Sequence, residues 1–148
     1  MDYHYQYPRP AVTVDILLIS KSVPCRILLI QRLRDPFINQ WALPGGFVNE
    51  NEDLSVAAAR ELKEETNIEG LELHQFQTYG TPFRDPRGHT VSVVFWGEID
   101  AESTAICAGD DAGDALWFPI ESLPLLAFDH HQIVTDFLSF FKPRYVTK

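Results

Sequence analysis

Cysteine, basic residues and long apolar runs are all scarce in this sequence, and each shortage excludes a class of protein. The 148 residues include two cysteines, Cys25 and Cys107, whose spacing matches neither a metal site nor a redox motif. We therefore interpret both as buried, reduced thiols and expect a cytoplasmic protein. No apolar stretch approaches the ~20 residues that cross a membrane, and the N-terminus lacks the basic start and apolar run of a signal peptide. A membrane partner is not expected.

The charge balance is acidic. Lys and Arg number 12 against 21 Asp and Glu, which gives a formal net charge of -9. Stable binding to a nucleic-acid backbone needs a basic surface that displaces counterions, so no nucleic-acid partner is expected. Small anionic substrates remain compatible with this charge, because a bound divalent cation can reverse the field where carboxylates cluster.

A chain of 148 residues suits one domain, which we expect to span residues 1–148. Apolar β-rich runs predict strands, and apolar residues at helical spacing or runs of Ala, Leu, Glu and Lys predict helices. The predicted strands are residues 11–20, 26–32, 71–79, 90–99 and 116–120, and the predicted helices are residues 53–66 and 130–141. Asn51 is the predicted N-cap of the first helix. This order predicts an α+β or α/β layered domain in which helices cover a mixed sheet.

The first predicted helix carries acidic residues on the face that should pack against the sheet. Its apolar stripe, at about 100° of rotation per residue, consists of Leu54, Ala58 and Leu62. Glu61 and Glu65 fall within that stripe, and Glu64 lies at its edge, one turn after Glu61. Three carboxylates therefore converge where a globular helix is normally apolar.

Carboxylates on a packing face require a compensating positive charge. Like charges at i,i+4 repel by a few tenths of a kcal/mol in water, and removing them from water raises the cost. A divalent cation would compensate, and carboxylate ligands suit Mg²⁺ or Mn²⁺ better than Zn²⁺. The alternative is a solvated acidic face near Lys63 and Arg60, which is disfavoured because the acids share the Leu/Ala arc.

The segment of residues 46–68 resembles the Nudix box. The match consists of Gly46, Glu52 and the run Arg60-Glu61-Leu62-Lys63-Glu64-Glu65-Thr66-Asn67-Ile68. The one departure is Asn67, where the family usually has Gly, and Asn is the next most tolerated residue in the left-handed conformation after a helix. The preceding WALPGG is also similar to the family's approach to the box. The resemblance implies a metal-dependent pyrophosphohydrolase with the Nudix fold, an α/β/α sandwich with a mixed sheet.

The resemblance also implies roles for individual residues. Mg²⁺, or Mn²⁺ as a substitute, would be bound by Glu61, Glu64, Glu65 and the carbonyl of Gly45. Either Glu64 or Glu65 would act as the base, while Glu52 and Arg60 would pair and hold the loop against the helix. Glycine at position 46 would let the backbone approach metal and phosphate. Further candidate substrate contacts are Arg32 and Trp41.

A second segment, TPFRDPRGH at residues 81–89, is similar to the RDPRG loop of bacterial Nudix proteins that hydrolyse ADP-ribose and of their regulator relatives. Arg84 and Arg87 would supply bidentate donors to phosphates and ribose hydroxyls. The alternative is a tight turn with solvated arginines, and the presence of a pair favours binding. We therefore expect a small nucleotide substrate, ADP-ribose, with AMP and ribose 5-phosphate as the products.

The acidic loop of residues 109–114 and the pair His130-His131 can each be interpreted in two ways. The acidic loop of residues 109–114 lies where many Nudix enzymes carry a further acid that orients or deprotonates water, and Asp114 is the candidate. A solvated turn explains Asp110 and Asp111 nearly as well. His130 and His131 resemble a recurrent Asp-His feature of the same relatives, but at a helix start we interpret them as a cap and a packing contact.

Two other functions compete with ADP-ribose hydrolysis. A nucleoside triphosphate pyrophosphohydrolase, including one for oxidised nucleotides, would carry the same box. A regulator that senses ADP-ribose would carry an added winged-helix domain, and because the sequence ends at Lys148, soon after the last predicted helix, we expect an enzyme. The aromatic N-terminal segment could serve the interface of a homodimer.

Overall fold

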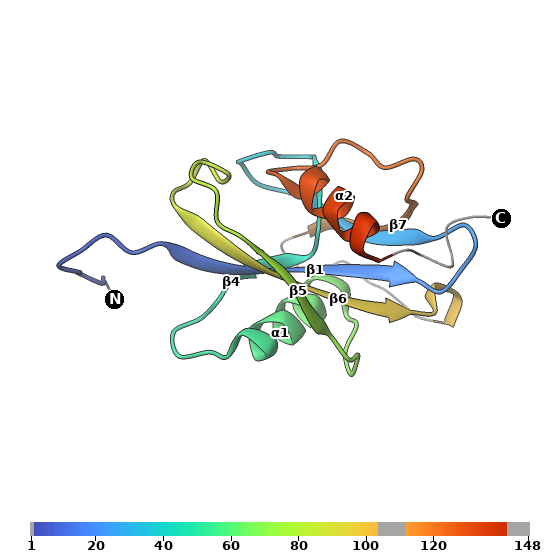
Figure 1. The fold of residues 1–148 in the computed structure, drawn as a ribbon, viewed down its shortest axis with the longest axis horizontal. Coiled ribbons are helices and arrows are strands. Elements are labelled where there is room, and N and C mark those ends of the chain that lie inside the picture. Colours follow the sequence, from blue (N-terminus) through green and yellow to red (C-terminus); the bar gives the residue numbers. More distant parts are fainter. Residues whose placement is uncertain (1, 104–111, 142–148) are drawn as a thin grey trace.

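The computed structural model describes residues 2–103 and 112–141 and has three layers. Helix α1 (Leu54–Thr66) and helix α2 (His130–Phe140) lie on opposite faces of a mixed sheet, as Figure 1 shows. The predicted α+β class and the α/β/α sandwich are therefore confirmed. Within the described residues, no helix is long and apolar enough to span a membrane.

In the described residues the sheet contains seven strands. The strands are β1 (Ala11–Ser20), β2 (Arg26–Arg32), β3 (Trp41–Ala42), β4 (Gly45–Phe47), β5 (His74–Tyr79), β6 (Thr90–Ile99) and β7 (Ala112–Pro119), and a short 3-10 turn, η1, covers Ala101–Ser103. Three of the strands, β1, β2 and β6, have the predicted bounds. The main path runs β3-β2-β1-β6-β5, with β4 paired to β1 and β7 paired to β2. Among the strands of the described residues, β1 pairs with β6 in parallel and the other pairs are antiparallel.

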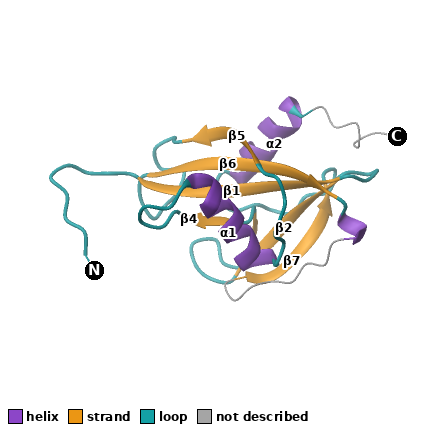
Figure 2. Cartoon of the chain, turned by 90° about the horizontal axis from the view of Figure 1, so that it is seen from below, coloured by secondary structure: helices purple, strands orange, loops and turns teal. Residues whose placement is uncertain are grey.

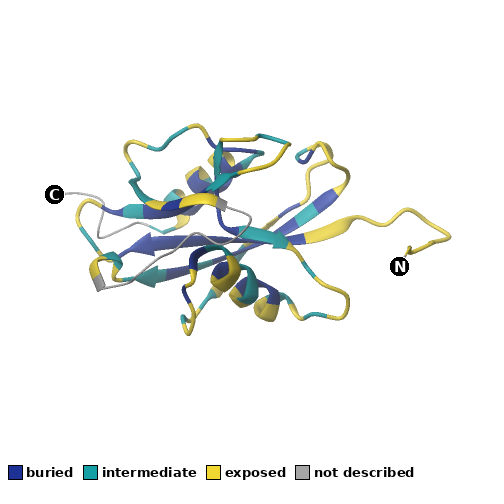
Figure 3. Ribbon diagram, turned by 180° about the vertical axis from the view of Figure 1, so that it is seen from behind, coloured by how far each residue is buried: buried dark blue, intermediate teal, exposed yellow. Residues whose placement is uncertain are grey.

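Strand β1 is the centre of the core because both of its faces are covered. Its uninterrupted apolar run is typical of a strand buried on two sides. One face packs against α1 through Val14, Ile16 and Leu18, which meet Ala57, Ala58 and Leu62. The other face packs against α2 through Leu17 and Ile19, which meet Ile133, Val134 and Phe137. Figure 3 shows these buried residues concentrated in the middle layer.

Several predicted boundaries are corrected by the structure. Helix α1 is capped by Asp53, whose side chain accepts a hydrogen bond from the Ser55 backbone N–H, so the predicted N-cap at Asn51 is wrong. Asn51 instead has φ 60° in the preceding turn. Strand β5 begins at His74 rather than residue 71, because Leu71 and Leu73 fill the core beside α1 without pairing along a strand.

The other differences are at the C-terminal half. Strand β7 starts at Ala112, four residues before the prediction, since its Gly113-Asp114 start has no apolar signal but still pairs with β2. Helix α2 ends at Phe140, one residue early. The short strands β3 and β4 were not predicted, because two or three residues are too few to show a periodic pattern.

The pairing of β4 with β1 positions the candidate site. Gly45 lies opposite Asp15 and Gly46 lies opposite Val14. Figure 2 shows α1 against the sheet beside β4. The chain before α1 is therefore held between the helix and the central strand.

Candidate active site

Arg60 on α1 connects the helix to the loop that precedes it. Its Nε donates to Glu52 Oε2 at 2.6 Å, and its Nη2 donates to Glu52 Oε1 at 2.9 Å and to the Phe47 carbonyl at 3.1 Å. The predicted pairing of Glu52 with Arg60 is thus present. These hydrogen bonds, together with one from the Asn49 N–H, lower the pKa of Glu52 to about 2. Glu52 is consequently charged at any physiological pH.

The same guanidinium also faces two of the predicted metal ligands. Arg60 Nη1 donates to Glu61 Oε1 at 2.8 Å and lies 3.2 Å from Glu64 Oε1. The Glu61 side chain is 13% exposed, whereas that of Glu64 is 57% exposed. Burial raises the pKa of Glu61, although Arg60 opposes the shift. Glu61 therefore lies on the packing side of α1 and Glu64 at its edge, as the helical spacing predicts.

The two glycines before α1 approach their neighbours too closely for any side chain. A Cβ on Gly45 would lie 2.2 Å from the Val14 carbonyl oxygen, and one on Gly46 would lie 2.6 Å from the carboxyl carbon of Glu61. The Gly45 N–H donates to Glu65 Oε1 at 2.7 Å. Glycine is required at position 45, where a Cβ would meet backbone atoms of β1, whereas at position 46 a Cβ would displace the Glu61 carboxylate.

The carboxylates have the chemistry of a site for a hard cation, although they are turned toward protein partners. Across residues 2–103 and 112–141, no three acidic, histidine or cysteine side chains are grouped as a metal site. Glu61 faces Arg60, and Glu65 faces the Gly45 N–H. The half-buried carboxylate of Glu61 with its raised pKa, beside a backbone without side chains, nevertheless fits the oxygen ligands that Mg²⁺ takes.

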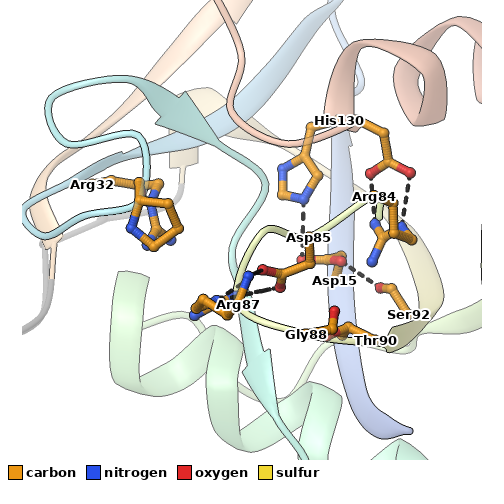
Figure 4. Close-up of polar contacts among 11 residues, drawn as sticks. Asp15, Arg32, Arg84, Asp85, Arg87, Gly88, Thr90, Ser92 and His130 are labelled. Atoms are coloured by element: carbon orange, nitrogen blue, oxygen red, sulfur yellow. Dashed lines mark hydrogen bonds and ion pairs between the residues drawn. The ribbon is translucent and has the colours of Figure 1, made fainter. Parts of the chain in front are cut away.

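A cleft brings the glycines together with the predicted substrate loop. Its volume is about 80 Å³, so it can enclose only part of a dinucleotide, whose sites usually measure ~300–1,000 Å³. From the α1 side it is lined by Gly45, Gly46 and Glu65, and from the other side by Arg32, Arg84 and Arg87. Figure 4 shows Arg32, Arg84 and Arg87 with Asp15, Asp85 and His130, which also line this cleft. Six of the predicted site residues therefore share one cleft.

Each loop arginine is bound to a carboxylate of the protein. Arg84, whose side chain is 5% exposed, donates through Nε and Nη2 to Asp129 at 2.8 and 2.6 Å. Burial alone would lower the pKa of Arg84, but the contact with Asp129 raises it. Arg87 binds Asp85 with its Nε and Nη2, and although burial opposes the shift, this contact lowers the pKa of Asp85. A phosphate would have to use the Nη1 side of either arginine.

Arg32 differs from the two loop arginines. Its Nε donates to the Pro36 carbonyl at 2.7 Å, and its guanidinium lies 4.9 Å from the centre of the Phe128 ring. It forms no ion pair within the part of the chain that the structure describes. Burial and the nearby charge of Arg87 lower the pKa of Arg32. The charges of Glu65, Asp85 and Asp15 oppose that shift, and a partly buried guanidinium in the cleft is well placed to meet an anionic ligand.

A buried polar cluster that includes two lining residues of the cleft, Asp15 and His130, was not recognised from the sequence. Asp15, in the middle of β1, accepts a hydrogen bond from Ser92 Oγ and lies 3.6 Å from His130 Nε2. His130 Nδ1 accepts the Leu43 N–H at 3.0 Å, and burial lowers the pKa of this histidine. The ring is therefore neutral, with its hydrogen on Nε2. An acid inside the apolar run AVTVDILLIS was the available signal, because such a group needs partners when buried.

The other six predicted site residues do not line the cleft; Glu52, Arg60, Glu61 and Glu64 lie beside it on α1 and its preceding loop, and Trp41 and Asp114 lie on other strands. Trp41 packs edge-on against Phe118, with ring centres 4.8 Å apart, and does not line the cleft. Asp114 is exposed on β7, where its side chain accepts the Ala115 N–H at 2.8 Å. Asp110 and Asp111 lie outside the described residues. His131 is exposed, in contrast to the buried His130, so a packing role holds only for the latter.

Comparisons with known proteins agree with this geometry. The NUDIX domain model matches residues 9–137. The chain is 42% identical to the ADP-ribose pyrophosphatase of Methanocaldococcus jannaschii, over 89% of this chain and 75% of the relative. It is 38% identical to the ADPR responsive transcriptional repressor NtrR of Acinetobacter baylyi, over 86% of this chain and 53% of that protein.

Solved structures give the same fold. The NUDIX domain of Shewanella oneidensis NrtR, complexed with ADP ribose, superposes with a TM-score of 0.84 and 30% sequence identity. The match covers 90% of each chain. The layered fold described above is thus shared along nearly the whole length of that domain.

Proposed function

The chain belongs to the NUDIX domain family of pyrophosphohydrolases, and from that premise we propose that it hydrolyses ADP-ribose to AMP and ribose 5-phosphate. One observation carries the proposal. The cleft is lined by Gly45, Gly46 and Glu65 on one side and by Arg32, Arg84 and Arg87 on the other. A diphosphate bound there would meet carboxylates and arginines together.

The basic wall of the cleft would bind the diphosphate. Arg32 supplies a guanidinium that contacts no carboxylate of the described residues, and Arg87 supplies its Nη1 side. Arg84 supports the loop through Asp129. Because the cleft measures about 80 Å³, the adenosine and the terminal ribose extend beyond it.

The acidic wall would carry the reaction. Glu61, Glu64, Glu65 and the Gly45 carbonyl are the residues that would hold Mg²⁺, for which Mn²⁺ is the substitute; the bound ion supplies neutralisation of the diphosphate and a water of lowered pKa. A carboxylate, Glu64 or Glu65, accepts the proton of the attacking water. Arg60 orients Glu61 and, through Glu52, fixes the loop before α1.

A substrate panel tests this proposal. ADP-ribose, NADH, diadenosine polyphosphates, CTP and 8-oxo-dGTP are assayed with Mg²⁺ and with Mn²⁺, and the products are identified chromatographically. We expect ADP-ribose to have the highest kcat/KM and to yield AMP and ribose 5-phosphate in equal amounts. Faster turnover of the triphosphates would reject ADP-ribose as the substrate and favour a nucleoside triphosphate pyrophosphohydrolase.

A regulatory role is the second candidate, and the similarity to a transcriptional repressor favours it. The expectation that no nucleic acid is bound therefore remains a prediction. ADP-ribose binding measured by calorimetry separates the two functions. Tight binding without turnover in Mg²⁺ or Mn²⁺ would favour a sensor, and turnover would favour the enzyme.

A further inference from the structure

The turn that leads into α2 adopts a backbone conformation that its sequence does not favour. Phe128 has φ 53°, in the left-handed region that bulky residues rarely occupy. Hydrogen bonds hold the turn on both sides: the Ala127 N–H donates to the Trp41 carbonyl at 2.8 Å, and the His130 N–H donates to the Ala127 carbonyl at 3.1 Å. Such a conformation persists where surrounding contacts determine it, and it is frequent at functional sites.

Phe128 connects two arginines from different parts of the chain. The guanidinium carbon of Arg32, on β2, lies 4.9 Å from the centre of the Phe128 ring, and that of Arg87, on the substrate loop, lies 5.2 Å from it. Phe37 packs edge-on against the same ring at 4.8 Å. Arg87 also lies 4.8 Å from the Phe47 ring and pairs with Asp85, but Phe128 is the ring that both arginines share, and its attraction offsets part of their mutual repulsion.

Asp129, the next residue, holds the third arginine. It accepts both hydrogen bonds of the Arg84 fork, and Arg84 is nearly inaccessible to solvent. A bidentate pair of this kind fixes orientation as well as distance. The substrate loop is therefore attached to the turn at Arg84 by Asp129 and at Arg87 by Phe128.

His130, the third residue, holds the opposite wall of the cleft. Its Nδ1 accepts the N–H of Leu43, two residues before Gly45. Its Nε2 faces Asp15 on β1, as Figure 4 shows. Because β1 also pairs with β4 at Gly45, this contact ties the glycine segment to the same turn.

We propose that Phe128, Asp129 and His130 form a positioning turn, which sets the separation between the arginines and the glycine segment of the cleft. The proposal rests on the proposed function, since that separation matters for a ligand that contacts both walls. The three residues act through their neighbours: Phe128 through Arg32 and Arg87, Asp129 through Arg84, and His130 through the Leu43 N–H.

The sharpest test is Phe128→Leu, which keeps an apolar side chain and removes the aromatic ring. Losing two cation–π contacts of ordinary strength should raise KM about five- to thirtyfold while kcat changes little. The matched control is Phe140→Leu on α2, the helix that follows the turn, because Phe140 packs against Phe76 and Trp96, away from the cleft. Thermal unfolding of both variants separates positioning from a general loss of stability.

A second variant tests the ion pair between Arg84 and Asp129. Asp129→Asn should raise KM because Arg84 loses its charged partner. The control is Asp136→Asn on α2, which removes the carboxylate that accepts a hydrogen bond from Tyr79 and should leave KM unchanged. If Phe128→Leu and Asp129→Asn matched their controls within twofold in KM, the positioning turn would be rejected.

The kinetic comparison is made on the best substrate of the panel, and ADP-ribose binding is measured in parallel. If ADP-ribose is not hydrolysed, the proposed function fails, but the ratio of KM between each variant and its control still tests the turn. A selective rise in KM for Phe128→Leu on any diphosphate or triphosphate substrate supports the turn.

Discussion

The two walls of the cleft hold their charges in different ways. On the α1 side a single guanidinium, that of Arg60, serves Glu52, Glu61 and Glu64. On the opposite side each loop arginine has its own carboxylate, Asp129 for Arg84 and Asp85 for Arg87. The carboxylates of the α1 side therefore outnumber their one guanidinium, while on the opposite side the two loop arginines are paired and Arg32 adds a further positive charge.

From this difference we expect the two walls to affect different kinetic constants. A wall with surplus carboxylates can accept a cation by exchanging partners, so changes there should affect turnover. On the basic side, Arg84 and Arg87 are already held by their carboxylates before any ligand binds, so changes there should affect binding. Each of the following experiments tests that expectation, beginning with the largest effect.

Replacement of Glu65 by Gln should have the largest consequence. The amide keeps the size of the side chain and can still accept the Gly45 N–H, but it cannot take up a proton or bind a cation as a carboxylate does. We expect kcat for Mg²⁺-dependent hydrolysis to fall about 10²- to 10⁴-fold with the thermal midpoint nearly unchanged. Glu69→Gln, at an exposed residue paired with Lys63, is the control. Full activity of Glu65→Gln would reject the proposed site.

Gly46→Ala tests the close approach on the same wall. The new methyl group would lie 2.6 Å from the carboxyl carbon of Glu61, so the Glu61 carboxylate must leave its position and its hydrogen bond with Arg60. We expect a loss of about 1–3 kcal/mol in the free energy of unfolding, measured by urea denaturation, together with reduced kcat. In Gly80→Ala the added carbon meets Val91 at an ordinary 3.5 Å, and this control should retain both. Equal stability of the two variants would contradict the crowding described here.

On the basic wall, Arg32→Lys should change binding alone. Lysine keeps the charge but loses the planar group that lies over Phe128. A rise of about tenfold in KM, equivalent to about 1.4 kcal/mol, is expected with kcat retained. Arg26→Lys removes an arginine that pairs with the exposed Glu102 and should leave both constants unchanged. A drop in kcat without a change in KM would overturn the division between the walls.

The smallest effect concerns the pH dependence of stability. Burial lowers the pKa of His130; the carboxylates of Asp15 and Asp129 oppose the shift, and Arg84 and Arg32 add to it. Below about pH 6.5 the unfolded chain binds a proton that the native histidine does not, so the free energy of unfolding falls as the pH decreases. Urea denaturation at about pH 7.5 and about pH 5.5 should show a loss about 1 kcal/mol larger in wild type than in His130→Gln. The exposed neighbour provides the control, and His131→Gln should behave as wild type.

The α1 wall was predictable because its geometry is local. Glu61, Glu64 and Glu65 are placed by helical rotation alone, and Asn67 adopts the left-handed conformation, φ 65°, that its position after the helix requires. The bounds of β1, β2 and β6 also match the sequence patterns. Such features depend on residues a few positions apart, so the sequence contains the information directly.

The basic wall could be predicted only in part. The resemblance identified Arg84 and Arg87, but their partner residues and the ring of Phe128 come from distant segments that spacing does not connect. For the same reason Asp15 and His130 were not recognised as a pair. Trp41 packs against Phe118 outside the cleft, and its contact with substrate stays a prediction.

The parallel pairing of β1 with β6 has a consequence for biosynthesis. Ala11 pairs with Thr90 and Ser20 pairs with Ile99, so the central strand has no long partner until most of the chain has left the ribosome. The entropy cost of closing so long a loop comes before the β1–β6 contacts can stabilise the chain. Pairing of these strands is therefore slower than the formation of local structures such as α1. During that interval the apolar run of β1 is open to chaperones and to aggregation, and the nascent protein is most vulnerable there.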